Sequence, residues 1–294
     1  MSIATILLLI LWVYTVIFLV ILVKDIIAHK GEIKSEKGTT VVANSVVSLI
    51  ANFFDTLGIG SFAIATSAWK FTKSISDDLI PGTLNVVFAV PVVTEATIFI
   101  QRIDMDPLTL VLMIVSSAIA AMIGAKIMSK LDIMKIRLVL GIALIIVAII
   151  TLCKINAIGP FGIIGSARGL TGGMLIVGVV VNFFLGALMT AGIGLYAPCM
   201  ALVLLLGMSA DIAFPVMMGS CAYLMPSAGI TFVKEGKYDR ASAIPMLILG
   251  VIGVLIAGFI VTSLPLTLLT YLVCIVMVIC ALMFFHDARK QSIK

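Results

Sequence analysis

Long runs of apolar residues, separated by short polar stretches, fill most of the chain. A transmembrane helix needs about 20 apolar residues to cross the hydrocarbon core of a bilayer. Seven runs reach that length: 3–23, 82–101, 108–128, 134–153, 215–233, 242–263 and 266–286. The first run has no basic segment before it and no small-residue cleavage site after it, so we expect a retained helix and not a signal peptide. The pattern predicts an all-α polytopic membrane protein.

Two further apolar regions, 41–73 and 174–207, are interrupted in the middle by the sequence Gly-Ile-Gly. Glycine, and Pro198 just beyond the second interruption, disfavour a continuous helix. Each region is therefore predicted to be a pair of helical segments joined at the glycines. Two full spans and a re-entrant hairpin both fit this pattern.

Composition and charge support the membrane assignment. Of the 294 residues, 62% are hydrophobic and only 11% are charged, against roughly 25% charged residues in a soluble domain. Placing the N-terminus outside and the C-terminus in the cytoplasm leaves all but three of the 19 Lys and Arg on the cytoplasmic side, as the positive-inside rule requires. We therefore expect a multi-pass protein of the cell (inner or plasma) membrane. The basic residues then mark topology and do not form a nucleic-acid-binding face.

The glycine interruption belongs to an internal repeat. Residues 52–54 (Asn-Phe-Phe) recur at 182–184, and after a four-residue insertion residues 58–60 (Gly-Ile-Gly) recur at 192–194. Each copy has a broken pair followed by three full spans, and because three is odd the copies are expected to be inverted, as in many secondary transporters. The predicted divisions are an N-terminal helix with a cytoplasmic loop (1–40), a first repeat (41–153), a glycine-rich external linker (154–173) and a second repeat with a short cytoplasmic tail (174–294).

The repeated interruption is a candidate anion site. Lipid offers no hydrogen-bond partners, so irregular backbone at membrane depth survives only where protein or a water-filled cavity satisfies it. The helix after each interruption begins with free N–H groups and the positive end of its dipole, which suit an anion. Close helix packing through small residues is the alternative explanation of the glycines.

Several short motifs, present in both halves, resemble the TauE/SafE sulfite exporter family, also called the 4-toluene sulfonate uptake permease family. They are the entries "LGIGSFAIA" and "AGIGLYAPCMALVLLLG", the helix starts "IPGTLNVVFAVP" and "MMGSCAYLMPSAG", and the polar turns "QRIDMDP" and "EGKYDRAS". The resemblance covers about residues 41–285 and implies transport of small organosulfur anions such as sulfite or sulfonates. The chain departs from the family in having Gly-Ile-Gly-Ser at 58–61 where three glycines are usual, and Gly-Thr-Leu at 82–84 where Gly-Thr-Ser is usual.

Neutral hydrogen-bonding groups and glycines near the two interruptions are the expected substrate contacts, because they can hold an anion without a full counter-charge. Hydrogen bonding between helices is the alternative use of such side chains. The candidates are Asn52, Gly58, Gly60, Ser61, Thr83 and Asn85 in the first repeat, and Asn182, Gly192, Gly194, Tyr196, Ser220 and Tyr223 in the second.

Two carboxylates are candidates for coupling transport to an H⁺ or Na⁺ gradient. Asp55 lies beside the first interruption and Glu95 within the predicted span 82–101. Charged groups at membrane depth are costly and usually functional. Capping of the interrupted helix is the alternative role of Asp55, and an ion pair with Arg102 is the alternative role of Glu95.

These features together favour a secondary transporter with alternating access, which acts on a small anion within the lipid bilayer and needs no cofactor or metal. An enzyme is disfavoured, because the histidines, His29 and His286, lie at segment ends, Asp55 has no evident aspartate partner, and no Walker motif is present. The five cysteines, scattered through apolar runs, indicate no disulfide framework or metal site. A transporter of small carboxylates, an anion channel and a non-transporting accessory protein are the alternatives, and a homo-oligomer is left open.

Overall fold

The computed structural model describes residues 3–30, 38–76, 78–128, 133–156, 158, 165–189 and 195–292. Within these ranges the chain is helical apart from short connections and one isolated β-bridge between Ala167 and Met208. Seven helices in the described part of the chain are long and apolar enough to cross a membrane. The predicted all-α polytopic class is confirmed.

The helices follow the predicted apolar runs closely. They are α1 (Ile3–Ala28), α2 (Gly38–Thr56), α3 (Ser61–Thr72), α4 (Ile80–Val87), α5 (Ala89–Arg102), α6 (Pro107–Met128), α7 (Ile133–Ile155), α8 (Gly172–Met189), α9 (Tyr196–Leu205), the 3-10 helix η1 (Ala210–Ile212), α10 (Ala213–Lys234), α11 (Ala243–Ser263) and α12 (Leu266–Ser292).

The two predicted broken pairs are α2 with α3 and α8 with α9. The first helix of each pair, with 19 and 18 residues, is about 27–29 Å long at 1.5 Å per residue, close to the thickness of the hydrocarbon core. The second helix of each pair, with 12 and 10 residues, is about 15–18 Å long. Each pair therefore combines a helix of nearly spanning length with a half-length helix.

The predicted span 82–101 is interrupted once. Helix α4 ends at Val87 and α5 begins at Ala89, with Phe88 between them. Pro91 has no N–H group to donate to the carbonyl oxygen of Val87, four residues earlier, and this lost hydrogen bond explains the interruption. The region from Ile80 to Arg102 is still long enough to cross a membrane.

The chain divides into two compact units that do not coincide with the predicted repeats. Unit 1 comprises Met1–Phe99 and Cys221–Thr262, and so contains α1 to α4, most of α5, the C-terminal part of α10, and α11. Unit 2 comprises Ile100–Ser220 and Ser263–Lys294, and so contains α6 to α9, η1, the start of α10, and α12. Each unit takes helices from both repeats.

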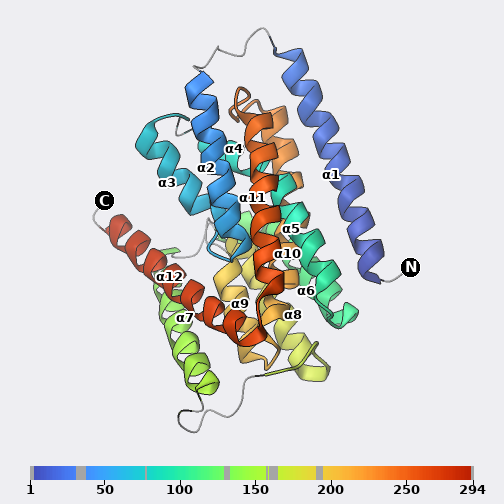
Figure 1. Ribbon diagram of the computed structural model, residues 1–294, viewed down its shortest axis with the longest axis vertical. Coiled ribbons are helices and arrows are strands. Elements are labelled where there is room, and N and C mark those ends of the chain that lie inside the picture. The colour runs from blue at the N-terminus through green and yellow to red at the C-terminus, as the bar shows by residue number, and fades with distance from the viewer. Residues whose placement is uncertain are drawn as a thin grey trace. The chain divides into compact units, whose positions relative to one another are not determined.

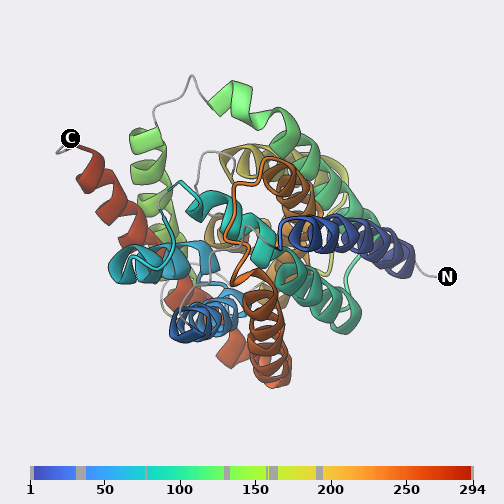
Figure 2. The same ribbon diagram turned by 90° about the horizontal axis from the view of Figure 1, so that it is seen from above.

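Within unit 1, helix α2 packs closely against α11 (Figures 1 and 2). A Cβ atom added to Gly253 of α11 would lie 2.3 Å from the carbonyl oxygen of Leu49. Ser48 Oγ of α2 donates a hydrogen bond of 2.7 Å to the carbonyl oxygen of Met246. The missing side chain of Gly253 thus allows the two backbones to approach, as small residues do between membrane helices.

Within unit 2, α8 and α6 form the corresponding pair. A Cβ atom added to Gly186 of α8 would lie 2.4 Å from the carbonyl oxygen of Ser117. Asn182 Nδ2 of α8 donates a hydrogen bond of 2.7 Å to the carbonyl oxygen of Met113. Since α6 and α11 occupy the same place in their repeats, the first helix of each repeat packs against the equivalent helix of the other.

A charged cluster in unit 1 joins α1 to the connection between α10 and α11. The Asp25 carboxylate accepts hydrogen bonds from Arg240 Nε at 2.7 Å, Arg240 Nη2 at 3.2 Å and the Tyr238 hydroxyl at 2.7 Å. Burial and the hydrogen bond to Asp25 raise the pKa of the Tyr238 phenol, and the hydrogen bond to Asp25 raises the pKa of Arg240. The cluster fixes the C-terminal end of α1.

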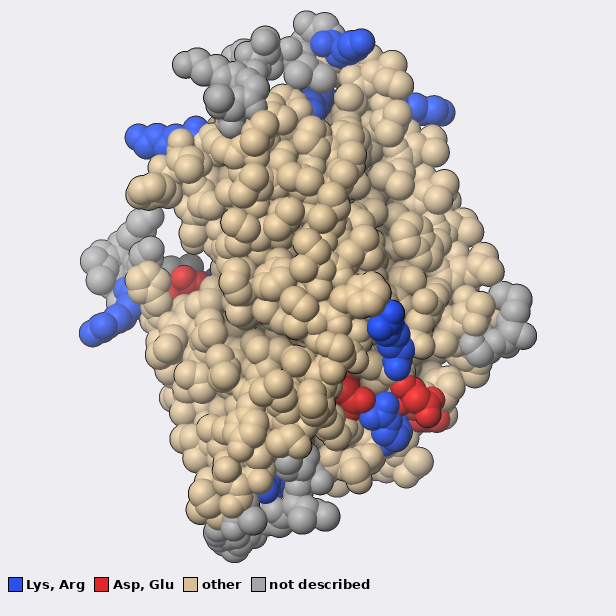
Figure 3. All heavy atoms as spheres, viewed as in Figure 1, with Lys and Arg blue, Asp and Glu red and all other residues tan. Residues whose placement is uncertain are grey.

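The molecular surface suits a lipid environment. On the face shown in Figure 3, Lys, Arg, Asp and Glu occupy only a few separate positions. Large apolar side chains are exposed along the helices; on α1 they include Ile10, Val13 and Val16, each more than half exposed. Such side chains would be costly in water and are stable against lipid tails.

Candidate functional site

The first interruption is a turn that requires glycine. Gly58 and Gly60 have φ angles of 97° and 88°, a backbone conformation that glycine adopts without steric cost. The N–H of Gly58 donates to the carbonyl oxygen of Asp55 at 2.7 Å, and the N–H of Ile59 donates to that of Phe54 at 3.0 Å. This pair of bonds is a Schellman motif, which ends α2 and satisfies its last carbonyl groups.

Asp55 caps the helix that follows the turn. Its side chain is 3% exposed, and Oδ1 accepts a 2.7 Å hydrogen bond from the backbone N–H of Ser61, the first residue of α3. The carboxylate therefore lies at the positive end of the α3 dipole. Asp55 therefore caps α3, which is the alternative role that the sequence suggested for it. The Ser61 N–H, which was expected to face a substrate anion, donates its hydrogen bond to Asp55.

A buried polar stripe runs along α2. Asn44, Ser48, Asn52 and Thr56 are spaced four residues apart, so they share one face of the helix, and each is at most 1% exposed. The sequence interpretation selected only Asn52 from this stripe. The regular spacing of four polar residues in an apolar run was the signal that would have identified Ser48 and Thr56.

Glu95 of α5 meets this stripe. The Glu95 side chain is fully buried, and its Oε1 lies 2.8 Å from Thr56 Oγ1. Thr56 Oγ1 is also 2.8 Å from the carbonyl oxygen of Asn52. A threonine hydroxyl has one proton and can donate to only one of these two oxygens at a time. If Glu95 is protonated, it donates to Thr56 while Thr56 donates to Asn52, and both contacts are hydrogen bonds.

The amide of Asn52 is only partly satisfied. Its Nδ2 donates to the Ser48 carbonyl oxygen at 2.8 Å and lies 3.3 Å from Ser48 Oγ. Its Oδ1 is buried and has no hydrogen-bond partner within the described residues. Because the nitrogen faces a carbonyl oxygen, the orientation of the amide is defined. The free atom of this predicted substrate contact is therefore an acceptor, which suits a cation or a donor group.

Asn182, the repeat equivalent of Asn52, also has an amide oxygen that is free within the described part of the chain, but its amide nitrogen contacts other helices of unit 2 and not its own helix. Its Nδ2 donates to the Met113 carbonyl oxygen at 2.7 Å and lies 3.4 Å from Ser220 Oγ. Its Oδ1 is buried and, among the residues that the structure describes, has no hydrogen-bond partner. The structure thus brings Asn182 and Ser220 together, as two predicted substrate contacts of the second repeat.

Thr83 and Asn85 make local hydrogen bonds in unit 1. Thr83 Oγ1 donates to the Leu79 carbonyl oxygen at 2.8 Å and accepts from the N–H of Asp239 at 2.9 Å. Asn85 Nδ2 donates to the Pro81 carbonyl oxygen at 2.9 Å. In this structure Thr83 joins the start of α4 to the α10–α11 connection, and the hydrogen bond of Asn85 lies within α4.

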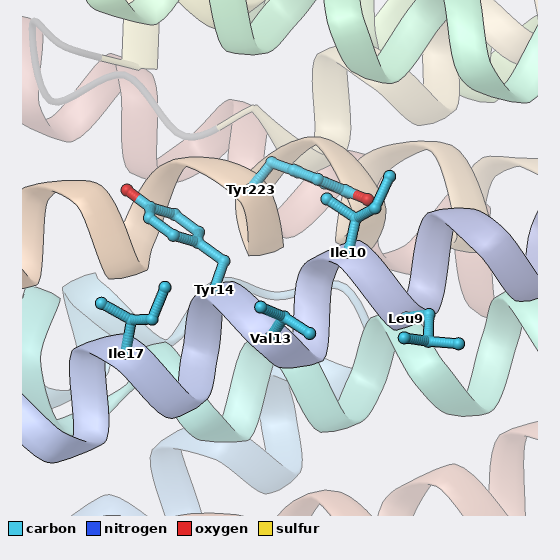
Figure 4. Close-up of a pocket in the computed structure, with 6 residues that line it drawn as sticks. All are labelled: Leu9, Ile10, Val13, Tyr14, Ile17 and Tyr223. Carbon is cyan, nitrogen blue, oxygen red and sulfur yellow. The ribbon is translucent and has the colours of Figure 1, made fainter.

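Tyr223 faces helix α1. Its hydroxyl donates to the Leu7 carbonyl oxygen, and its ring lines a cavity of about 340 Å³ on α1 (Figure 4). The cavity is lined by Leu9, Ile10, Val13, Tyr14, Ile17 and Tyr223. Its wall is almost entirely apolar, so it does not resemble the expected anion site.

The second interruption is described only in part. Gly192 and Gly194 lie outside the described residues, and α9 begins at Tyr196, which is 8% exposed. Neither candidate carboxylate is repeated in this half. The stretch 185–189, which follows the repeated Asn-Phe-Phe as Asp55 does, is apolar, and the residue aligned with Glu95 is Gly229. The first interruption is thus flanked by buried acidic groups, whereas the aligned positions of the second repeat are neutral.

The relation of the chain to known proteins rests on its sequence motifs. The resemblance to the TauE/SafE family stays a prediction. Comparison with protein-family models, with curated proteins and with solved structures finds no match to this chain.

Proposed function

We propose that this membrane protein is a secondary transporter of a small organosulfur anion, such as sulfite or a sulfonate, coupled to protons through Glu95. The contact of Glu95 with Thr56 is the observation that carries the proposal. A carboxyl group in a fully buried position is costly to maintain and is rarely placed among membrane helices without a function. No catalytic role is assigned to any residue.

The proton acts by completing the hydrogen bonds around Thr56. Protonated Glu95 donates to the Thr56 hydroxyl, which donates to the Asn52 carbonyl oxygen. After the proton leaves, the Thr56 hydroxyl can donate to only one of these two oxygens, and an ionised carboxylate is left in a fully buried position, which is costly. Binding and release of a proton at Glu95 thus favour two different arrangements of α2 and α5. Coupling of transport to a proton gradient requires a conformational equilibrium that depends on protonation in this way.

The substrate anion is assigned to the second interruption. At the start of α3 the Asp55 carboxylate already accepts from the Ser61 N–H, so that helix end holds an anionic group of the protein itself. The first turn of α9 carries no acidic residue. Its N–H groups and dipole suit an external oxyanion, and the TauE/SafE resemblance implies an organosulfur one. In this proposal the N-terminus lies outside the cell membrane.

Transport into proteoliposomes tests the proposal. Wild-type protein should accumulate labelled sulfite or isethionate when an inward proton gradient is imposed. The Glu95→Gln variant keeps a donor for Thr56 but cannot release a proton, so it should exchange the anion across the membrane without accumulating it. Glu235→Gln, at a carboxylate that is about half exposed (48%), is the matched control and should behave as wild type. Gradient-driven accumulation by Glu95→Gln would contradict the proton assignment, and accumulation driven by sodium alone would reassign the coupling ion.

A further inference from the structure

Trp69 has a buried donor that the proposed function does not use. The side chain, on the half-length helix α3, is fully buried. Its Nε1–H has no hydrogen-bond partner within the described residues. The indole nitrogen can only donate, and buried donors in proteins are almost always paired with an acceptor. A buried donor of this kind is available to an acceptor atom of a ligand.

The other tryptophan shows the usual situation. Trp12 of α1 donates from Nε1 to Thr97 Oγ1 at 3.0 Å, so its polar atom is satisfied by a neighbouring helix. Both residues lie in unit 1. The contrast makes Trp12 a natural control for Trp69, since the two side chains are chemically identical and differ in whether the donor is used.

The Trp69 indole packs against the ring of Phe88, which in turn contacts Phe62. Its ring centroid is 6.1 Å from that of Phe88, and the centroid of Phe88 is 6.2 Å from that of Phe62. Phe88 is the residue that interrupts α4 and α5. The indole N–H therefore lies in a buried, partly aromatic environment beside the interruption between α4 and α5, where a hydrogen bond to an anion is not weakened by competing water.

The position of Trp69 along α3 separates it from the capped turn. Ser61, Ala65 and Trp69 form the buried face of α3, and the separation of eight residue steps between Ser61 and Trp69 corresponds to about 12 Å along the helix axis. Lys70 and Lys73, both exposed, lie within one turn of Trp69 in the sequence. Their positive charges offset the negative end of the α3 dipole and favour the approach of an anion.

We propose that the Trp69 indole N–H donates a hydrogen bond to an oxygen of the transported anion, at a binding position near the lysine-bearing end of α3. The inference rests on the proposed function for the nature of the ligand. It adds a binding residue that is distinct from both glycine interruptions. The anion is attracted by Lys70 and Lys73 and held by the one buried donor on this face of α3 that lacks a partner among the described residues.

Tryptophan fluorescence of purified protein tests this assignment directly. The chain has two tryptophans, so Trp12→Phe leaves Trp69 as the only one, and Trp69→Phe leaves Trp12. Sodium sulfite and sodium isethionate are titrated into each variant, against sodium chloride at equal ionic strength. We expect a saturable change in emission for Trp12→Phe and none for Trp69→Phe. The melting temperature is measured in the same samples, because a ligand that binds the folded state raises it.

Affinity provides the second readout. Trp69→Phe keeps an aromatic ring and removes only the donor, so it should weaken anion binding at this position by about tenfold or more, as expected for a hydrogen bond to a charged group. Its melting temperature without anion should not fall below that of wild type, because the donor that it removes is unpaired among the described residues. A rise in melting temperature with no change in Trp69 emission, or unchanged affinity in Trp69→Phe, would overturn the assignment and leave the proposed function standing. Absence of any anion-dependent rise in melting temperature would overturn both.

Discussion

Replacing Gly253 with alanine should destabilise the contact between α2 and α11. The added Cβ atom would lie 2.3 Å from the Leu49 carbonyl oxygen, 3.1 Å from the Leu49 carbonyl carbon and 3.2 Å from the Phe53 nitrogen. All three are backbone atoms and cannot rotate away, so the helices must separate. Overpacking of this kind costs about 1–3 kcal/mol.

A second glycine separates this cost from the intrinsic preference of alanine for helices. Alanine gains up to about 1 kcal/mol over glycine in a helix, and Gly173 of α8 has nothing within 4 Å of its added Cβ atom. Gly173→Ala should therefore be neutral or slightly stabilising. Gly253→Ala should be less stable than this control by about 1–3 kcal/mol, or about 2–12 °C in melting temperature.

Thermal unfolding in detergent, followed with a thiol-reactive dye, measures the difference because four of the five cysteines are buried until the protein unfolds. Gly186→Ala, which would place Cβ 2.4 Å from the Ser117 carbonyl oxygen, should be destabilised by a similar amount in unit 2. A Gly253→Ala variant that melts at or above the Gly173→Ala control would refute the close approach of the two helices.

Three further predictions concern the turn and the charged cluster. Asp55→Ala should cost about 1–2 kcal/mol because the buried N–H of Ser61 loses its acceptor, whereas Asp55→Asn keeps an acceptor oxygen; equal melting temperatures of the two variants would contradict the cap. Asp25→Asn should cost about 1–3 kcal/mol by weakening the hydrogen bonds from Arg240, and this loss should appear as a lower melting temperature at neutral pH. The pKa of Tyr238 is raised in the folded protein, so the stability that this residue contributes is complete below its ordinary pKa of about 10 and is lost as the pH rises towards the raised value. Wild type should therefore lose stability above about pH 10 more steeply than Tyr238→Phe, which is measured as melting temperature against pH.

Much of the fold could be predicted because a membrane helix needs only a long apolar run. The run 242–263 became α11 (Ala243–Ser263), and the first glycine interruption became the turn between α2 and α3. The interruption at Phe88 was missed. Pro91 was its signal, but proline alone does not decide the outcome, since Pro226 lies within the continuous helix α10.

The parts of the candidate site that join residues close together in the sequence could be predicted. Asp55 and the N–H it caps are six residues apart, and a carboxylate beside a glycine turn is a recognisable cap. The contact of Thr56 with Glu95 joins residues 39 apart, and the pattern of apolar residues does not specify which helices become neighbours. For the same reason, the sequence did not reveal that each compact unit takes helices from both repeats.

The composition of the two units has a consequence for biosynthesis. Residues up to Phe99 leave the ribosome first, but unit 1 also needs Cys221–Thr262, which follow only after residues 100–220 have been made. Until then the polar stripe on α2 lacks Met246, the partner of Ser48, and must be tolerated by the lipid, by the translocation machinery or by temporary neighbours. Cutting the gene between the two repeats would therefore yield two fragments that each lack part of both units, and stable protein should form only when both fragments are made in the same cell.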